Sequence, residues 1–443
     1  MSELGFHTLL VPFGTAGDVH PFIGLGIELR RRGHRVTLIV NPYFERLALD
    51  NGFGFAPVGS KEEFEQLLCD PSLWHPLRGS RILAQHVTAY MPLQMEAIEN
   101  LHDPGRTVAI ASGGSFGARV AQEKLRMPLV TVALQPALFR SYHHLPVLAG
   151  VPRIPDGLPR FLKSLVFRVF DFVADRALSA STINAYRAEH GLPPTRGFMK
   201  NWWVSPDRVI GLFPEWYAPR QPDWPAQMKM TGFPLYDERR DGVSLAGELI
   251  EWLRNGDRPI VFTPGSAMIH GQAFFAAAAG ACSALGRRGL FLTRYPQQIP
   301  SPLPAGIRHE SYVPFSQLLH HAAALVYHGG IGTMSQAMVA GIPHFIMPMA
   351  HDQPDNAYRI QQLGIGDSLP PRLFRAAALA EKLGRLLASA EVAANCRRVA
   401  ARFVGVDFIS DSCDLIEEIA RRKGIADRLS TGSSSVMTAD LSG

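Results

Sequence analysis

Residues that can bind a phosphorylated ligand are concentrated between positions 324 and 360. An apolar run ends there in His328-Gly-Gly-Ile-Gly-Thr333, and a helix-forming stretch follows. A glycine-rich turn that leads into a helix directs backbone N–H groups and the positive end of the helix dipole at one point, which suits phosphate. Further along, Asp352 and Gln353 can exchange hydrogen bonds with hydroxyl groups. The combination indicates a ligand that is part nucleotide and part sugar.

We predict that the backbone N–H groups from Gly330 through Gly332 to Thr333 bind a diphosphate. The ring of His328 and the hydroxyl of Thr333 are expected to be additional donors. The alternative is a plain strand-to-helix turn in which the glycines serve geometry alone, but the histidine, the threonine and the later Asp-Gln pair favour a binding site.

A second glycine turn, Thr263-Pro-Gly265-Ser266, follows the first strand of the same half of the sequence. In a parallel sheet such loops gather at the carboxyl edge, where ligands bind. We therefore expect Gly265 and Ser266 to meet the same phosphates, although a turn of this kind is by itself a weak signal.

The first half of the sequence supplies a candidate base in the turn Gly14-Thr-Ala-Gly-Asp18-Val-His20-Pro21. Asp18 precedes the predicted start of a helix at Pro21, so the alternative is a simple N-cap worth about 1 kcal/mol. A carboxylate with an ordinary pKa of about 4 is a weak base, which burial in a cleft would improve. His20 is the rival base. Gly14, at the start of this turn, is predicted to help bind the donor.

Several common cofactor motifs are absent from the sequence. No G-x-G-x-x-G follows the first strand, Ser335 occupies the third glycine position after Gly330 and Gly332, and there is no P-loop. There is also no H-E-x-x-H, and no D-x-D to hold a metal against a diphosphate. We expect metal-independent chemistry without a cofactor, in which backbone donors, the helix dipole and His328 neutralise the leaving phosphates.

Two apolar stretches, 134–150 and 160–178, can line an acceptor pocket or rest on a membrane surface. Phe139, His143 and His144 are the candidate acceptor contacts, and ordinary core packing is the alternative. The net charge of +5 suits an anionic ligand or membrane but is no nucleic-acid footprint.

Strands alternate with helices in two separate halves, which predicts α/β domains with parallel sheets. A stretch rich in Pro and Trp, 212–242, lies between the halves. We expect an N-terminal acceptor-binding domain, a connector, a C-terminal donor-binding domain and a disordered Ser/Gly-rich tail, at 1–215, 216–245, 246–426 and 427–443.

The composition, 47% apolar and 19% charged over 443 residues, is that of a globular protein with room for two domains. The four cysteines form no C-x-x-C pair, no long apolar run is present, and the N-terminus reads as a strand instead of a signal peptide. These features predict a cytoplasmic location.

The stretches YVPFSQLL, YHGGIGTMSQA, AGIP and HDQ resemble the donor signature of nucleotide-sugar glycosyltransferases with the GT-B fold. The opening GTAGDVHPFIGLGIELRRRGHRVTL is similar to the acceptor-domain start of their bacterial and sterol branch. The resemblance covers nearly the whole sequence. It implies two Rossmann-like domains facing a central cleft, with Asp18 preferred to His20 as the base, and with Tyr312 and Val313 beside the nucleobase.

A narrower resemblance, in DPSLWHP, LFPEWYAPRQPDWP, MTGFPLYD and AHDQPDNAYR, is to the rhamnosyltransferase B-component family of rhamnolipid synthesis. That family transfers L-rhamnose from dTDP-L-rhamnose to a 3-(3-hydroxyalkanoyloxy)alkanoic acid. It works at the cytoplasmic side of the inner membrane with a partner protein, the A component. The sequence departs from its relatives in two places. Gln336 replaces a ribose-binding Glu of many relatives outside this branch, and Leu134–Phe139 replaces a Ser-rich stretch of the family.

The resemblance therefore implies an inverting glycosyltransferase that makes a mono-rhamnolipid from a dTDP- or UDP-sugar and an apolar hydroxylated acceptor. It also implies peripheral contact with the inner membrane and a partner protein like the A component. The alternatives are a UDP-glucose-dependent enzyme for a sterol-like or polyketide acceptor, and a non-catalytic sugar-nucleotide-binding partner protein.

Overall fold

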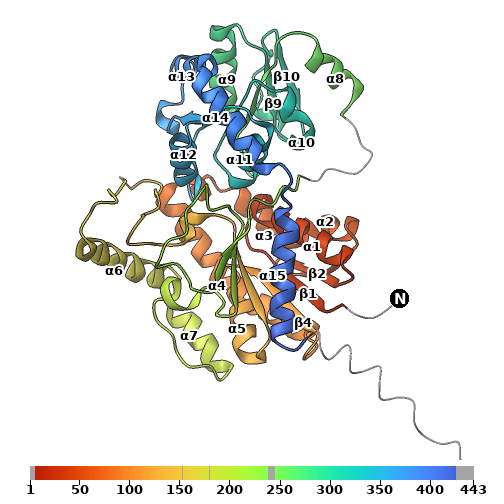
Figure 1. Cartoon of the computed structure of the whole chain (residues 1–443), viewed down its shortest axis with the longest axis vertical. Helices are drawn as coiled ribbons and strands as arrows, with labels where there is room; N and C mark the ends of the chain where they lie inside the picture. The colour runs from red at the N-terminus through yellow and green to blue at the C-terminus, as the bar shows by residue number, and fades with distance from the viewer. Residues whose placement is uncertain (1–4, 152, 179, 238–244, 426–443) are drawn as a thin grey trace, which may run out of the picture.

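A computed structural model describes residues 5–151, 153–178, 180–237 and 245–425. Two α/β domains follow one another along the long axis of the molecule, as Figure 1 shows. One domain contains a sheet of seven strands and the other a sheet of six. Every strand pair in the two sheets is parallel, which confirms the predicted fold class.

The first sheet has its earliest strand in the interior, with later strands added on both sides, which is the order of a doubly wound domain. From edge to edge its strands are β3 (Gly54–Pro57), β2 (Arg35–Val40), β1 (His7–Val11), β4 (Thr107–Ser112), β5 (Leu129–Ala133), β6 (Arg208–Gly211) and β7 (Met228–Met230).

The second sheet repeats this plan with one strand fewer. Its strands are, in spatial order, β10 (Ile307–Glu310), β9 (Gly289–Leu292), β8 (Ile260–Thr263), β11 (Ala324–Tyr327), β12 (His344–Ile346) and β13 (Gly366–Ser368).

Helices cover both faces of each sheet, because the inner strands are apolar on both sides. In β1, Leu9 and Val11 pack in one hydrophobic cluster and Leu10 packs in another on the opposite face. The α-helices of the described residues are α1 (Ala16–Arg31), α2 (Glu45–Asp50), α3 (Lys61–Cys69), α4 (Pro76–Leu101), α5 (Phe116–Leu125), α6 (Arg160–Ala177), α7 (Ala180–Glu189), α8 (Gly247–Arg254), α9 (Gln272–Leu285), α10 (Phe315–Leu318), α11 (Ile331–Ala340), α12 (Gln353–Gln362), α13 (Ala376–Ala388), α14 (Ala390–Ala400) and α15 (Phe408–Arg422). None of the helices in the described residues is both long enough and apolar enough to cross a membrane.

Helix α1 begins at Ala16, so the predicted start at Pro21 is wrong. The reason is a capping arrangement. The Oδ2 atom of Asp18, in the first helical turn, accepts a hydrogen bond from the backbone N–H of Thr15 at 2.8 Å. Pro21 then falls inside the helix. The N-cap is therefore Thr15, and Asp18 lies inside the helix as the N3 residue of a capping box instead of being the N-cap itself.

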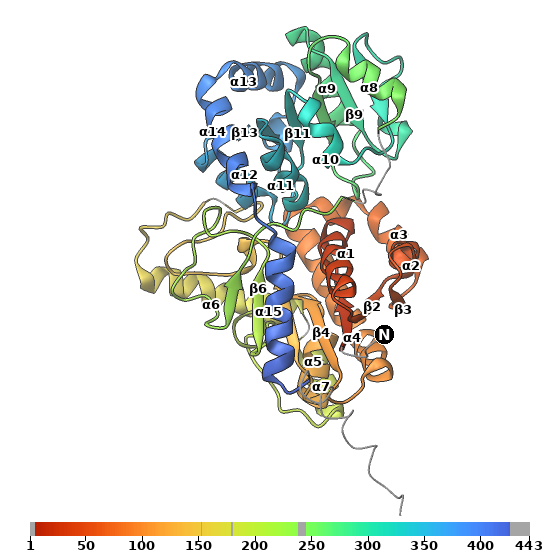
Figure 2. The ribbon, with the colours of Figure 1, turned by 45° about the vertical axis from the view of Figure 1, so that its right-hand side comes forward.

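The last described helix, α15, leaves the second domain and packs beside α1 in the first, as Figures 1 and 2 show. Arg32 at the end of α1 forms an ion pair with Asp414 at 2.6 Å, and Arg208 pairs with Glu418 at 2.8 Å. Cys413 and Ile416 enter the same cluster as Leu10. The assignment of 246–426 to the second domain is corrected by this return, because the apolar face of α15 is buried on the first domain.

The connector predicted at 216–245 is only partly irregular, since it contains β7, which extends the first sheet beyond β6. Its residues 238–244, and the tail predicted at 427–443, lie outside the described residues.

Candidate active site

The two predicted glycine turns meet at the carboxyl edge of the second sheet, because β8 and β11 are neighbours and Thr263 lies opposite Tyr327. Both turns pack against the ring of His328. A Cβ atom on Gly330 would lie 2.5 Å from its Nε2, and one on Gly265 would lie 2.9 Å from its Cε1. Glycine is therefore required on both sides of this ring. Ser266, next in the second turn, is exposed at the cleft.

Burial lowers the pKa of His328 to about 4 by desolvating the charged ring. The neutral imidazole can act as a hydrogen-bond donor but carries no positive charge at neutral pH. Among the described residues, its buried Nδ1 has no hydrogen-bond partner. A buried polar atom of this kind is costly unless a ligand or water satisfies it.

Helix α11 starts directly after these glycines, with Gly330 as its N-cap residue. Gly332 and Thr333 lie in its first turn, where backbone N–H groups have no partner within the helix. A Cβ atom at Gly332 would meet nothing within 4 Å. The turn is thus open at the place where the sequence predicts the diphosphate.

Gln353 holds the loop that carries Asp352 in place through hydrogen bonds to its backbone. The buried Oε1 of Gln353 accepts hydrogen bonds from the backbone N–H groups of Met349 at 2.8 Å and Ala350 at 3.2 Å. His351 takes up a left-handed conformation with φ 58°, which is uncommon for a residue other than glycine. Its ring contacts Trp74 of the first domain, with the ring centroids 6.0 Å apart.

Asp352 is oriented by Asn356, one helical turn further along α12. The Nδ2 group of Asn356 donates to Oδ2 of Asp352 at 2.7 Å and to the carbonyl of Gly329 at 2.9 Å. The Oδ1 atom of Asn356 accepts a hydrogen bond from Tyr217 of the connector at 2.7 Å. Asn356 and Tyr217 were not predicted from the sequence. The spacing of four residues from Asp352 is the signal that could have identified Asn356.

A further contact between the domains involves Asp355, which is fully buried. One of its oxygens accepts from Arg359 at 2.7 Å, and the other accepts from the backbone N–H of Val147 at 3.0 Å. Arg359 also donates to the carbonyl of Tyr217 at 3.2 Å. Helix α12 is thus hydrogen-bonded to both the connector and the 139–151 loop of the first domain.

Asp18 lies at the start of α1, at the carboxyl edge of the first sheet. Desolvation raises its pKa from 3.8 to about 6, against the opposing effect of its hydrogen bonds from Thr15. Both bonds end on Oδ2, and Oδ1 accepts none from the described residues. Gly14, with φ 135°, makes room for the carboxylate, because a Cβ there would lie 2.2 Å from Oδ2.

The pKa of Asp352 is raised further, to about 7, mainly by burial and secondly by the negative charge of Asp18. The two carboxylates therefore share one site, although they come from different domains. A pair of carboxylates with raised pKa values in a cleft is typical of functional sites.

His20 is two residues from Asp18 and points elsewhere. Its ring lies edge-on to Tyr236 of the connector, with centroids 5.5 Å apart. It lines a cleft of about 360 Å³ together with Ser266 and Arg294 of the second domain.

Tyr312 and Val313 follow β10 in the second domain. Tyr312 is 42% exposed, its hydroxyl donates to the carbonyl of Asp237, and the Arg294 guanidinium lies 5.5 Å from its ring centroid. Val313 is buried. An exposed aromatic ring next to a cation can stack on a nucleobase, and the role that the resemblance implies for Tyr312 stays a prediction.

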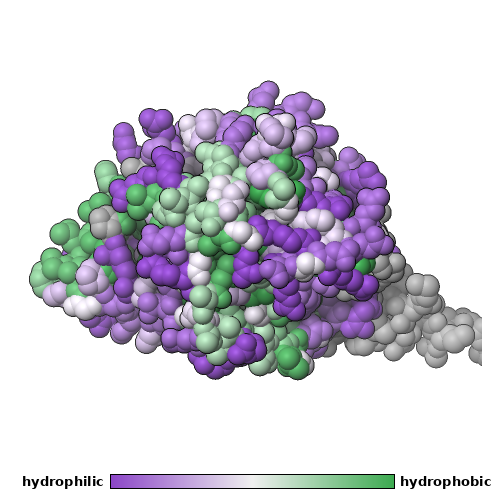
Figure 3. Space-filling view, turned by 90° about the horizontal axis from the view of Figure 1, so that it is seen from above, coloured by the Kyte–Doolittle hydropathy of each residue, from purple (hydrophilic) through white to green (hydrophobic). Residues whose placement is uncertain are grey.

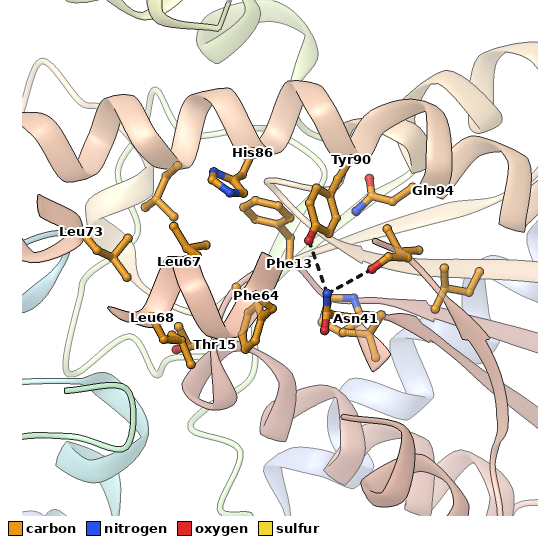
Figure 4. Close-up of a pocket in the computed structure, with 16 residues that line it drawn as sticks. Phe13, Thr15, Asn41, Phe64, Leu67, Leu68, Leu73, His86, Tyr90 and Gln94 are labelled. Atoms are coloured by element: carbon orange, nitrogen blue, oxygen red, sulfur yellow. Dashed lines mark hydrogen bonds between the residues drawn. The ribbon is translucent and has the colours of Figure 1, made fainter. Parts of the chain in front are cut away.

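An apolar cavity of about 50 Å³ lies beside Gly14 and Thr15, under α3 and α4 (Figure 4). Its wall is mainly aliphatic and aromatic, and it includes Phe13, Phe64, Leu67, Leu68, Leu73 and Leu83. The polar groups at its border are Asn41, His86, Tyr90 and Gln94. This cavity was not predicted from the sequence, because its lining residues come from distant segments.

The predicted acceptor contacts lie elsewhere. Phe139 is buried in the core between Trp203 and Trp224, with centroids 5.3 and 5.5 Å away. His143 is exposed, and His144 lies 3.4 Å from Asp156. These residues line neither of the two cavities described above. Within the described ranges, no group of three or more His, Cys, Asp or Glu side chains could hold a metal ion.

Two family models match the protein. The glycosyltransferase family 28 N-terminal domain matches residues 8–142, and the C-terminal domain of erythromycin biosynthesis protein CIII-like proteins matches residues 294–406. Among similar proteins, O-mycaminosyltylonolide 6-deoxyallosyltransferase of Streptomyces fradiae is 27% identical over 94% of this sequence and 98% of its own. Glycosyltransferase GtfC of Amycolatopsis orientalis is 28% identical over 82% of this sequence and 85% of its own.

Solved structures with this fold include the glycosyltransferase of kitacinnamycin, with a TM-score of 0.73 at 19% identity, over 94% of this protein and 99% of that one. Spinosyn rhamnosyltransferase SpnG in complex with thymidine diphosphate has a TM-score of 0.67 at 17% identity, over 93% of this protein and 100% of that one. The fold expected from the resemblance, GT-B, is confirmed. The protein is a glycosyltransferase with the GT-B fold, and its two domains are similar to the family 28 N-terminal domain and to the EryCIII-like C-terminal domain.

Proposed function

We propose that this glycosyltransferase transfers a hexose, with inversion, from a nucleoside diphosphate sugar to a hydroxyl group of an apolar acceptor. One observation carries the proposal. The partly exposed carboxylate of Asp18 has a raised pKa, lies near enough to the donor domain's Asp352 to raise its pKa, and is hydrogen-bonded to Thr15, which lines the apolar cavity. The proposed site therefore combines a base, a group that can bind sugar hydroxyls and a space for an apolar molecule.

In the proposed step, Asp18 accepts the proton of the acceptor hydroxyl as that oxygen attacks the anomeric carbon. The bond from the anomeric carbon to the phosphate oxygen breaks, and the diphosphate leaves with the electron pair. The open first turn of α11 and the neutral ring of His328 donate hydrogen bonds to the departing charge. Asp352 and Gln353 are proposed to hold the sugar.

The proposed donor is a dTDP-sugar, with dTDP-L-rhamnose as the first candidate from the resemblance to the rhamnosyltransferases of rhamnolipid synthesis. The fold of SpnG accommodates thymidine diphosphate, which supports this choice at the level of the fold. UDP-glucose is the second candidate, and Gln336, which stands where other branches have a ribose-binding Glu, counts against it.

The proposed acceptor is a hydroxylated lipid such as a 3-(3-hydroxyalkanoyloxy)alkanoate, whose acyl tails suit the aliphatic wall of the cavity. A second candidate is a polyketide. The similarity to the Streptomyces fradiae protein, which covers 98% of that protein, favours a polyketide acceptor. Its name describes a sugar transfer to a glycosylated tylonolide.

Transfer assays with purified protein test the proposal. dTDP-L-rhamnose and UDP-glucose are each paired with a hydroxyalkanoyloxyalkanoate and with a macrolide aglycone, and products are identified by mass spectrometry. A mono-rhamnolipid is the expected product. A glucosylated macrolide would establish the second candidate, and nucleotide binding without transfer or donor hydrolysis would contradict both. Repeating each assay with a chelator tests the prediction that no metal is needed. The partner protein like the A component stays a prediction from the resemblance.

A further inference from the structure

Helix α6 presents an apolar face to solvent, which is the reverse of an ordinary surface helix. Of the 17 large hydrophobic side chains that are exposed among the described residues, seven belong to α6. Phe161 is 71% exposed and Phe172 is 70% exposed. The other five are Leu165, Val166, Val169, Phe170 and Val173. Figure 3 shows hydrophobic side chains gathered at the left edge of the molecule, the side on which α6 lies in Figure 1.

This orientation of α6 is fixed by polar contacts on its inner side. Lys163 donates to the backbone carbonyls of Tyr142 and Asp156, at 2.5 Å each. Asp171 pairs with Arg140 at 2.5 Å, and Asp175 accepts two backbone hydrogen bonds at 3.0 Å from the segment that follows α7. The helix cannot turn its apolar face inward without breaking these bonds and leaving charged groups buried and unpaired.

The charges of α6 are divided in the same way. Both of its acidic residues, Asp171 and Asp175, are bound on the inner side, as is Lys163. The arginines Arg168 and Arg176 are exposed. An exposed apolar helix face that also carries arginines, with both acidic residues bound on the inner side, complements a surface that is apolar below and negatively charged above.

We propose that α6 docks this protein on an anionic lipid surface, with the two exposed phenylalanines inserted among the acyl tails and Arg168 and Arg176 at the headgroups. Partial insertion of such a helix is reversible and depends on both the apolar area and the lipid charge. This inference goes beyond the proposed function, and its test requires no sugar transfer.

The test is flotation of the full-length protein with vesicles of phosphatidylcholine alone and of phosphatidylcholine with phosphatidylglycerol. The wild type is expected to float with the anionic vesicles and to bind less at high salt. The double variant F161S/F172S is expected to lower the partition constant at least about tenfold, and R168E/R176E to remove the preference for anionic vesicles.

Matched controls are L49S and V404S, which replace exposed side chains on other parts of the surface, 56% and 81% exposed. They are expected to float like the wild type. Thermal unfolding should be unchanged in all variants, because the replaced side chains are exposed. A wild type that binds neither vesicle, or an F161S/F172S variant that binds as well as the wild type, overturns the proposal.

Light scattering separates lipid binding from self-association. If the wild type is a dimer that F161S/F172S converts to a monomer, and no vesicle is bound, α6 is an interface between two copies and the lipid proposal is wrong. A monomeric wild type that floats with anionic vesicles supports it.

Discussion

Asp18 of α1 and Asp352 at the start of α12 lie close enough across the cleft for the charge of Asp18 to raise the pKa of Asp352. Each domain contributes one of the two carboxylates, so the pair exists only while the domains are together. Burial raises both pKa values, to about 6 and about 7, which prepares one carboxylate to accept a proton near neutral pH.

Replacing Asp18 by Asn should abolish transfer while nucleotide binding stays near normal. The amide can still accept the hydrogen bond from Thr15, so α1 keeps its cap, but it cannot take a proton. Product formation and dTDP affinity by calorimetry measure the two effects. H20Q is the control and should retain transfer. Turnover in D18N within a few-fold of the wild type would remove Asp18 from the base role.

The same variant should be more stable than the wild type above pH 6. The folded-state pKa of Asp18 is raised from 3.8 to about 6, so protonation favours folding. That contribution is complete below about pH 4 and is lost as the pH rises through 6. D18N should therefore have the higher melting temperature at pH 8, with the difference shrinking below pH 4. An equal difference at both pH values would contradict the raised pKa.

The transfer rate should rise with pH through about 6, because only the ionised Asp18 can act as a base. Asp352 should contribute a second ionisation near 7, and the two groups titrate as a coupled pair. Rates at saturating donor across the acid range measure this limb. The limb should persist in H20Q. A rate that is independent of pH below 7 argues against a carboxylate base.

Replacing Gly332 by Ala separates the needs of the fold from those of the ligand. A Cβ there meets no protein atom, and alanine favours helices over glycine by about 1 kcal/mol. G332A should therefore fold with equal or higher stability. Its nucleotide affinity should nevertheless fall, since the methyl group would occupy the space of the predicted diphosphate. Unchanged dTDP affinity in G332A would show that the diphosphate binds elsewhere.

Asn356 should affect sugar transfer by positioning Asp352, without contacting the sugar itself. N356A removes buried hydrogen bonds to Asp352, Gly329 and Tyr217, worth about 1 kcal/mol each. We expect kcat/KM to fall at least roughly tenfold. Y217F, which removes one of these bonds, should have a smaller effect of the same kind. If N356A lowers the melting temperature but leaves kcat and KM unchanged, Asn356 only supports the fold.

Filling the apolar cavity should raise the KM for the acceptor and spare the donor. L67W adds an aromatic ring to the cavity wall beneath α4. Donor hydrolysis and dTDP affinity should remain, since His328 and α11 lie in the other domain. L49W, at an exposed position on α2, is the control. Equal acceptor KM values in L67W and wild type would place the acceptor outside this cavity.

Local sequence was enough to predict the two parallel α/β halves and the position of the glycine turn at His328. Apolar runs of strand length and glycines before a helix depend on neighbours within a few residues. The start of α1 was predicted five residues late, at Pro21, because Thr15 and Asp18 form a capping box that begins the helix before the position proline prefers.

Which residues meet depends on the tertiary fold. The return of α15 to the first domain, the contact from Tyr217 to Asn356 and the apolar cavity beside Gly14 join segments that are distant in sequence. Phe139 shows the limit most clearly. Its apolar character suits an acceptor pocket or a core equally, and packing between Trp203 and Trp224 places it in the core. The residue type determines which interactions a side chain can make, and the tertiary fold determines which partners surround it.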